Sequence, residues 1–286
     1  MDTKNKALIQ IHFAVFLFGV AGLFGKLIQL PSIIIVLGRV FFSSIFLYII
    51  ILFLKEKIKL NQKQHYFYLS LMGVILAIHW STFFQSIQLS TVAIGLLTFC
   101  TFPVFVTFLE PYFFKEQLKL SNCVIAIITL LGAILVIPSL KLGDNKAQGF
   151  LWGMVSSFTY AILSMLNRKY VKEYSSIVIS FYEQFVATIV LIPFLFIQKP
   201  VFKLNDILLL ILLGVVFTAI SHSLFINGLK NVKVQTASII SSLEPVYGIV
   251  FAIFLLGELP TLKEIVGGII ILGAAFYSTF RCYFVK

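Results

Sequence analysis

The feature that most constrains this chain is a succession of apolar segments, each about as long as a bilayer is thick. A helix needs about 20 mostly apolar residues to cross the hydrocarbon core of a membrane. Hydrophobic residues make up 60% of the 286 residues, charged residues only 12%, and the mean hydropathy is +1.04. An ordinary soluble domain carries roughly 25% charged residues. The sequence therefore predicts an integral membrane protein.

Short gaps that hold charges, prolines, glycines and asparagines separate the apolar segments. The segment lengths fit helices, because strands of a membrane barrel would appear as alternating segments of about 10 residues. We therefore expect an all-α membrane protein with ten transmembrane helices. The expected spans are 7–28, 33–54, 67–88, 90–110, 120–138, 149–167, 175–197, 206–227, 235–256 and 262–281. The turn at 88–91 must be very tight.

The net charge of +11 does not indicate nucleic-acid binding, because the basic residues lie in the gaps and form no continuous stripe. Positive charge in short loops marks the cytoplasmic side of a membrane protein. With the N-terminus inside, the cytoplasmic segments hold fifteen Lys and Arg residues and the outer loops six. We expect a multi-pass protein of the cell inner membrane with both termini in the cytoplasm. The first span should stay uncleaved, because no convincing small-residue cleavage site follows it.

No catalytic or cofactor-binding motif is present. The three cysteines include no CxxC pair, so we infer neither a disulfide framework nor a metal site. A P-loop, GxSxG, HExxH and a dinucleotide fingerprint are all missing from the sequence. We therefore expect no enzyme activity, no cofactor and no metal.

An internal repeat appears when the chain is shifted by 142 residues. AIHWSTFFQS (77–86) then lies on AISHSLFING (219–228). Pro103 matches Pro245 and Glu116 matches Glu258, with the same spacing from proline to glutamate in both copies. Five spans in each half would insert the halves in opposite directions, as in many secondary transporters. We predict one repeat over 1–142, with helices 1–5, and a second over 143–286, with helices 6–10.

At these residues the chain resembles the EamA-type branch of the drug/metabolite transporter superfamily. The pattern is a proline-centred span, a Gly-Glu loop and a glycine-rich last span, here TASIISSLEPVYGIVFAIFLLGELPTLKEIVGGIIILGA (236–274). The first half carries a weaker copy over 92–133, in which Lys115 replaces the glycine. The resemblance implies ten helices in two halves and a central cavity lined mainly by spans 1, 3, 4, 6, 8 and 9. Its members carry amino acids, drugs, nucleobases and other metabolites, so it leaves the substrate open.

Arg39 is an ionisable residue inside its span, six residues past the start at 33. At about 1.5 Å per residue it lies about 9 Å along the helix, where a charge is costly and usually faces a partner or a cavity. One reading is an intramembrane ion pair with Glu183, whose span is the repeat mate of the span that holds Arg39. The other is a fixed cation for a substrate carboxylate or phosphate.

Glu244 directly precedes Pro245, where the missing N–H and the ring clash should kink the helix. A kink exposes backbone carbonyl groups that have lost their hydrogen bond within the helix. A carboxyl group beside them could take up a proton or contact substrate, or it could be a structural hydrogen-bonded group. Pro103 should kink the repeat-related span in the same way.

The remaining polar residues inside spans are candidates for lining the cavity, or are hydrogen-bonded filler. With Glu244 they form the predicted substrate-binding set of His79, Trp80, Gln85, Asn167, His222 and Asn227. The repeat-equivalent glutamates Glu116 and Glu258 lie in helix-end loops, where capping or a salt bridge is expected. Small residues at 19–25 and 267–274 should allow close helix packing, and the last span could serve a homodimer contact.

We therefore expect a secondary transporter that moves small metabolites by alternating access, with amino acids or related compounds first and efflux preferred. Its partners would be the substrate and the lipid bilayer, with no nucleic acid. One alternative is an integral membrane enzyme acting on lipids, which would need clustered His, Asp and Glu near one interface. The other is a non-transporting membrane scaffold or sensor, which would have no cavity between the halves.

Overall fold

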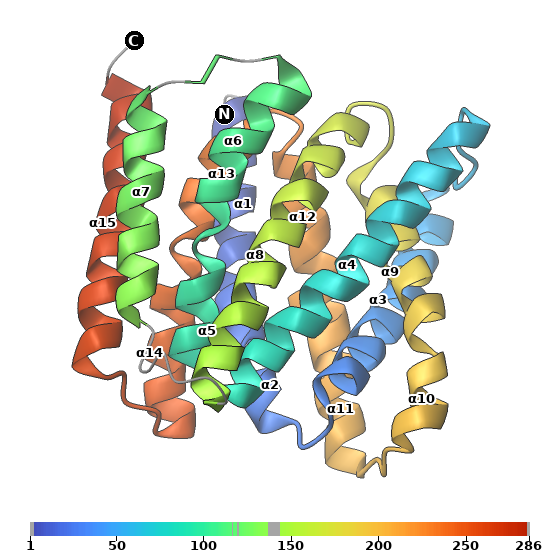
Figure 1. Cartoon of the computed structure of the whole chain (residues 1–286). Coiled ribbons are helices and arrows are strands. Elements are labelled where there is room, and N and C mark those ends of the chain that lie inside the picture. Colours follow the sequence, from blue (N-terminus) through green and yellow to red (C-terminus); the bar gives the residue numbers. More distant parts are fainter. Residues whose placement is uncertain (1–2, 116, 119, 137–143, 285–286) are drawn as a thin grey trace.

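The computed structural model describes residues 3–115, 117–118, 120–136 and 144–284, and within these residues every regular element is a helix (Figure 1). The elements are α1 (Thr3–Ala21), α2 (Phe24–Leu27), α3 (Ser32–Leu54), α4 (Lys63–Leu89), α5 (Val92–Phe99), α6 (Phe102–Phe114), α7 (Leu120–Val136), α8 (Asn145–Tyr170), α9 (Ser176–Leu191), α10 (Pro193–Gln198), α11 (Leu204–Gly214), the π-helix η1 (Val215–Ile220), α12 (Ser221–Gly228), α13 (Val234–Ser241), α14 (Glu244–Leu256) and α15 (Leu262–Phe284).

Eight helical segments in the described residues are long and apolar enough to cross a membrane. They are 3–27, 32–54, 63–89, 92–114, 145–170, 176–198, 204–228 and 234–256. Helices α7 and α15 pack against each other along one edge of the bundle (Figure 1). The prediction of an all-helical membrane protein is confirmed.

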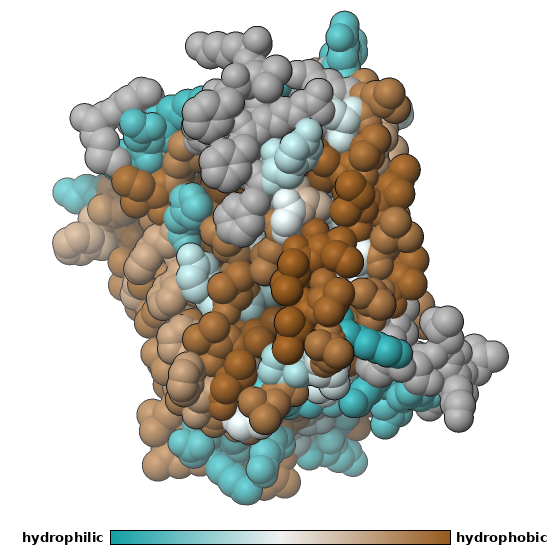
Figure 2. Space-filling model, turned by 90° about the vertical axis from the view of Figure 1, so that its left-hand side faces the viewer, coloured by the Kyte–Doolittle hydropathy of each residue, from teal (hydrophilic) through white to brown (hydrophobic). Residues whose placement is uncertain are grey.

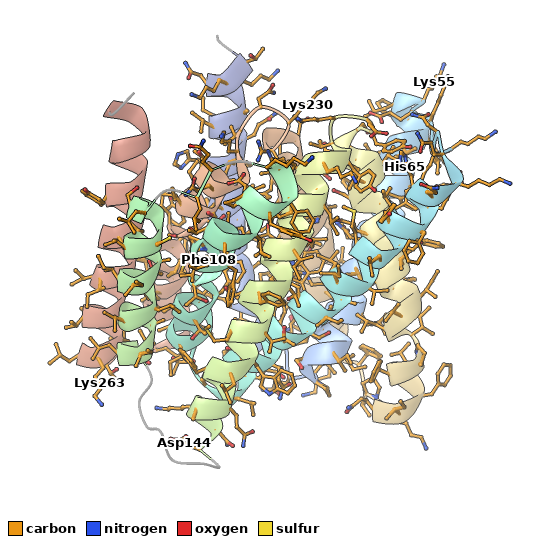
Figure 3. The ribbon with its side chains drawn as sticks, turned by 45° about the horizontal axis from the view of Figure 1, so that its top comes forward. Lys55, His65, Phe108, Asp144, Lys230 and Lys263 are labelled. Carbon is orange, nitrogen blue, oxygen red and sulfur yellow. The ribbon has the colours of Figure 1, made fainter. Side chains whose placement is uncertain are left out.

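The start of α1 and the end of α15 lie on the same side of the bundle (Figure 1). We call this side the termini face and the other the opposite face. Lys55 and Lys230 lie at the termini face, whereas Asp144 and Lys263 lie at the opposite face (Figure 3). The polar loops thus gather at the two ends of the helices.

An apolar belt covers the middle of the surface seen in Figure 2, and most polar residues lie above and below it. Large apolar side chains such as Phe53, Leu151 and Phe254 are exposed. A soluble monomer rarely exposes contiguous apolar patches larger than a few hundred Å². Lipid tails account for this surface.

Two spans are broken at positions 142 residues apart. Helix α5 gives way to α6 at Cys100–Thr101, and α13 gives way to α14 at Ser242–Leu243. The Cys100 Sγ lies 3.9 Å from the carbonyl oxygen of Ser242, so the two breaks meet inside the bundle.

The expected proline kinks take the form of helix starts. Pro103 and Pro245 each lie in the first turn of a new helix rather than in the interior of a bent one. A proline is tolerated in the first turn because that N–H has no partner within the helix anyway. The sequence therefore located the discontinuities to within a few residues but not their form.

Close packing of α1 on α14 depends on two glycines. A Cβ atom added to Gly19 would lie 2.6 Å from the backbone oxygen of Glu244, and one added to Gly248 would lie 2.8 Å from the backbone oxygen of Gly19. These contacts bring the first turn of α14, and with it Glu244, directly against α1.

Gly19→Ala is expected to lower the free energy of unfolding by about 1–3 kcal/mol, the usual cost of overpacking a close contact. Gly273→Ala is the matched control, because nothing lies within 4 Å of its added Cβ and alanine has the higher helix propensity. Unfolding of the two purified variants in detergent measures the difference. Equal stability of both variants would contradict the close contact between α1 and α14.

Candidate functional site

A pocket lies between helices of the two sequence halves, and its empty space is about 350 Å³ when the part open to solvent is included. Its lining comes from α1, α3, α4 and α5 of the first half and from α8, α12 and α14 of the second. We call it the chamber, and its lining residues are Phe18, Ala21, Arg39, His79, Trp80, Phe83, Phe99, Tyr160, His222 and Glu244. It combines a cation, a carboxyl group, two imidazoles and an aromatic wall.

Arg39 lies over the ring of Trp80 at the chamber wall. Its Cζ atom is 3.9 Å from the centroid of the Trp80 ring, and the residue is 2% exposed. Its Nε donates to the Thr218 hydroxyl at 2.9 Å, and Nη2 reaches the Phe217 carbonyl oxygen at 3.5 Å. A guanidinium has five N–H groups, so donors remain for an anionic ligand.

The partners of Arg39 come from the π-helix η1, which the sequence did not predict. The Thr218 hydroxyl also donates to the carbonyl oxygen of Leu213, five residues earlier, at 2.7 Å. A π-helical turn is wider than an α-helical one and often occurs at functional sites. Here it presents a hydroxyl and a carbonyl oxygen to one buried cation.

The expected ion pair of Arg39 with Glu183 does not form, and Glu183 bonds His222 instead. The Glu183 Oε2 and His222 Nε2 atoms are 2.6 Å apart, and both side chains are almost fully buried. The other polar atom of each, Oε1 and Nδ1, has no partner among the described residues. Glu183 is therefore hydrogen-bonded to His222 on α12. Among the described residues, Arg39 has no carboxylate bonded to it.

Glu244 is the carboxyl group that lines the chamber. It begins α14, is 4% exposed, and forms no hydrogen bond or ion pair with the described residues. It interacts electrostatically with Arg39, and the start of a helix favours a negative charge. The chamber thus holds a guanidinium and a carboxyl group that are not bonded to each other.

The aromatic wall is built around His79 and Tyr160. Their rings stack with centroids 4.6 Å apart, and His79 Nδ1 donates to the Ser156 carbonyl oxygen at 2.9 Å. Phe99 lies against both rings. Aromatic faces attract cations and planar groups, so this wall can hold the body of an organic molecule.

Three of the predicted substrate-binding residues lie outside the chamber lining. The Gln85 side-chain oxygen accepts from Ser32 at 2.6 Å, and the Asn227 amide donates to Gln10 at 3.0 Å. Asn167 is buried, and its Oδ1 has no partner among the described residues. The predicted residues that the structure brings together in the lining are His79, Trp80, His222 and Glu244.

Of the two loop glutamates, Glu258 lies within the described residues and Glu116 does not. Glu258 lies at the opposite face, where it accepts a hydrogen bond from the Val92 N–H. Lys115, which stands where the second copy has Gly257, adopts the same left-handed backbone, with φ of 53°.

Sequence reasoning missed the aromatic lining residues Phe18, Phe99 and Tyr160. The 142-residue shift could have found two of them, because it places Phe18 on Tyr160 as it places Trp80 on His222. Within the described residues no three His, Cys, Asp or Glu side chains converge as metal ligands would.

Comparison with known proteins gives one consistent family. The model of the EamA-like transporter family matches residues 5–137 and again 147–280. An uncharacterized transporter, YxxF, of Bacillus subtilis is 26% identical over 94% of this chain and 88% of its own length. An S-adenosylmethionine uptake transporter of Rickettsia bellii is 24% identical over 87% of this chain and 84% of its own.

A solved crystal structure agrees with this chain in fold. It superposes with a TM-score of 0.76 at 15% identity, over 98% of both chains. The two family matches together span nearly the whole sequence. The chain therefore belongs to the EamA-like transporter family and is a multi-pass membrane transporter.

Proposed function

We propose that the protein is a secondary carrier of small zwitterionic metabolites of the amino-acid class, and that it works by alternating access. The observation that carries the proposal is the pair of Arg39 and Glu244 in one chamber, a guanidinium and a carboxyl group that are not bonded to each other. A zwitterion carries a carboxylate for the guanidinium and a cationic group for the carboxyl. Carriers commonly bind substrate at the interface of their repeats.

The proposed architecture is ten transmembrane helices in two inverted repeats, 1–142 and 143–286. It is supported by the double match of the family model, by the helix breaks 142 residues apart, and by the apolar helices α7 and α15. The loop charges support an inner-membrane protein with both termini in the cytoplasm.

The aromatic wall narrows the substrate class further. Rings such as those of Trp80, Phe99 and Tyr160 suit a zwitterion whose remainder is planar, cationic or apolar. S-adenosylmethionine, named for the Rickettsia relative, is an amino acid with a sulfonium and an adenine ring, so it has this chemistry. We place it first among compounds to test, before aromatic amino acids, and keep export as the proposed net direction.

Uptake and counterflow in proteoliposomes test this function. The panel holds zwitterionic amino acids, S-adenosylmethionine, and matched compounds that lack either the carboxylate or the cationic group. We expect saturable flux of a zwitterion and at least tenfold less of either truncated analogue. Equal flux of a zwitterion and its decarboxylated analogue would overturn the charge-pair proposal. Repeating the assay with an imposed pH gradient separates proton-coupled transport from facilitated exchange.

Glu244→Gln is expected to abolish any dependence of uptake on the pH gradient. Glu244 is the carboxyl group of the chamber. The charged and titratable groups around it are Arg39, His79, Tyr160, His222, Cys100 and, bonded to His222, Glu183. Asp206→Asn is the matched control, because Asp206 caps α11 away from the chamber. Retained pH dependence in Glu244→Gln would move the proton site to the bonded pair of Glu183 and His222.

A further inference from the structure

We propose that two latches, one on each face, hold the chamber closed and that transport opens them in turn. Each latch joins a basic side chain and a helix start of one repeat to a carboxylate of the other. The opposite-face latch consists of Lys26, Val92 and Glu258. The termini-face latch consists of Arg168, Val234 and Glu110. The inference rests on the proposed carrier function and adds the residues that control access.

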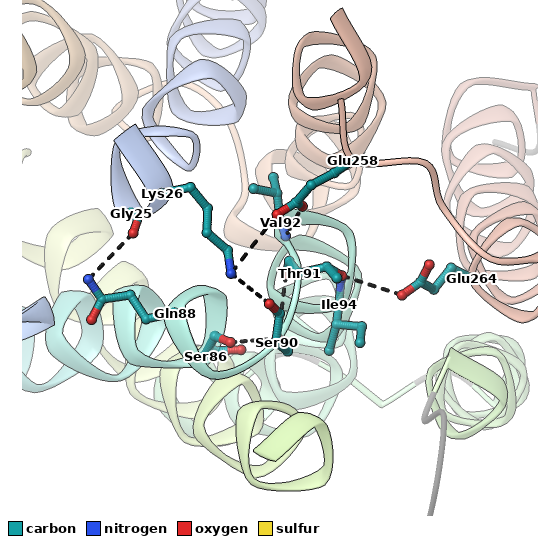
Figure 4. A network of polar contacts seen from close by, with 10 residues as sticks. All are labelled: Gly25, Lys26, Ser86, Gln88, Ser90, Thr91, Val92, Ile94, Glu258 and Glu264. Carbon is teal, nitrogen blue, oxygen red and sulfur yellow. Dashed lines mark hydrogen bonds and ion pairs between the residues drawn. The ribbon is translucent and has the colours of Figure 1, made fainter. Parts of the chain in front are cut away.

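The opposite-face latch ties the first repeat to the loop between α14 and α15 (Figure 4). The Val92 N–H, at the start of α5, donates to Glu258 Oε2 at 2.9 Å. Lys26 Nζ lies 4.0 Å from Glu258 Oε1 and donates to the Ser90 carbonyl oxygen at 2.7 Å. One carboxylate therefore holds the ends of α2 and α4 and the start of α5 against the second repeat.

The termini-face latch repeats this arrangement with the repeats exchanged. The Val234 N–H, at the start of α13, donates to Glu110 Oε1 at 3.0 Å, and the Gln235 N–H donates to Oε2 at 3.1 Å. Arg168, near the end of α8, lies 2.5 Å from the same carboxylate through Nη1. Glu110 on α6 thereby binds the first repeat to two helices of the second.

The sequence shift relates the two latches. Adding 142 to Lys26 gives Arg168, and adding 142 to Val92 gives Val234. In both latches a carboxylate caps a helix start, where the backbone N–H groups lack partners within the helix and the dipole favours an anion. Glu110 departs from strict symmetry, because the repeat mate of Glu258 is Glu116, which lies outside the described residues.

Both latches are closed in this structure, and the polar residues that line the chamber between them are buried. Arg39, His79, His222 and Glu244 are each at most 4% exposed. A carrier that alternates must pass through such a closed state and then separate its repeats at one face. The two carboxylates bridge the repeats at the two faces, so they are the contacts that such a separation breaks.

The latches differ in strength, which sets an order of opening. The side chains of Lys26 and Glu258 are each 25% exposed and 4.0 Å apart. Those of Arg168 and Glu110 are 13% and 4% exposed and in direct contact. A buried, hydrogen-bonded ion pair is far more costly to break by removing one partner than an exposed one. Without substrate, the carrier should therefore open more readily at the opposite face.

Sided labelling of the chamber tests the latches without relying on transport. The reporter is Ala21→Cys, a chamber residue, in the full chain with Cys100, Cys123 and Cys282 replaced by serine. A membrane-impermeant thiol reagent is added from one face at a time, to vesicles of defined orientation. We expect Glu258→Gln to raise labelling from the opposite face about threefold or more, and Glu110→Gln to raise it from the termini face about tenfold or more.

The labelling of each variant is compared with the labelling of its parent from the same face. The depth of the Ala21→Cys reporter is the same in both, so it does not affect the comparison. Glu173→Gln and Asp206→Asn remove other carboxylates at the two faces and should leave labelling unchanged. Lys26→Gln should reproduce the sidedness of Glu258→Gln and so guards against misfolding of one variant. Equal increases from both faces, or none in variants that remain folded, would overturn the latches. Sided labelling in a protein that moves no compound of the panel would support the latches and count against the proposed substrate class.

Discussion

Replacing Arg39 with lysine is expected to lower the initial rate of substrate uptake by about 30-fold or more. Lysine keeps the positive charge but loses the planar group that lies over Trp80 and binds Thr218, and that in the proposed function would also bind the substrate carboxylate. Disrupting a buried, hydrogen-bonded charge pair costs about 2 kcal/mol or more, which corresponds to that factor. Initial rates in proteoliposomes, normalised to folded protein, provide the measurement.

A graded series distinguishes substrate binding from general damage. Arg39→Gln removes the charge and should have a larger effect than Arg39→Lys. Thr218→Val leaves the charge and removes one hydrogen-bond acceptor, so it should cost about 1 kcal/mol, or about fivefold in rate. An uptake rate in Arg39→Lys equal to that of the parent would exclude Arg39 as the group that binds the substrate.

Removing His222 is expected to lower the free energy of unfolding by about 3–5 kcal/mol. His222→Ala leaves the Glu183 carboxyl group buried without its 2.6 Å partner, and an unpaired buried charge carries a cost of that size. Glu183→Ala should also destabilise strongly. Removing both side chains should lower the free energy of unfolding by less than the sum of the two single changes, because neither side chain then stays buried without its partner.

Chemical unfolding of the detergent-solubilised variants gives this double-mutant cycle. Glu173→Ala is the matched control, because Glu173 also pairs with a histidine, His65, at 3.6 Å but is 44% exposed. An exposed pair contributes about 1 kcal/mol or less. Additive single and double changes at Glu183 and His222 would contradict a coupled pair.

The overall helical architecture could be predicted because membrane helices leave a direct mark in the sequence. The lipid requires long apolar segments, and the structure places helices in them, including the tight turn at 88–91 between α4 and α5. The prolines marked both helix breaks, because proline is disfavoured within a helix. His79, Trp80, His222 and Glu244 stood out because polar groups are costly in lipid.

The partners of the buried charges could not be predicted from the same reasoning. Pairing of Glu183 with His222 rather than Arg39 depends on which side chains α9 and α12 turn toward each other. The π-helix η1 changes that rotation and places the Thr218 hydroxyl within hydrogen-bond distance of Arg39. No residue pattern in the sequence predicted this π-helix. The contacts of Glu110 with Arg168, Val234 and Gln235 of the second repeat likewise depend on how α6 packs beside α8 and α13.

Fluorescence of Trp80 tests the chamber most directly. The chain has two tryptophans, and Trp152 lies on the lipid-exposed side of α8, so Trp152→Phe leaves Trp80 as the single reporter beside Arg39. Titration with a transported zwitterion should change the Trp80 emission saturably, and Arg39→Lys or Glu244→Gln should shift the titration to at least tenfold higher concentration. A transported compound that leaves the emission unchanged at saturating concentration would show that substrate does not bind in this chamber.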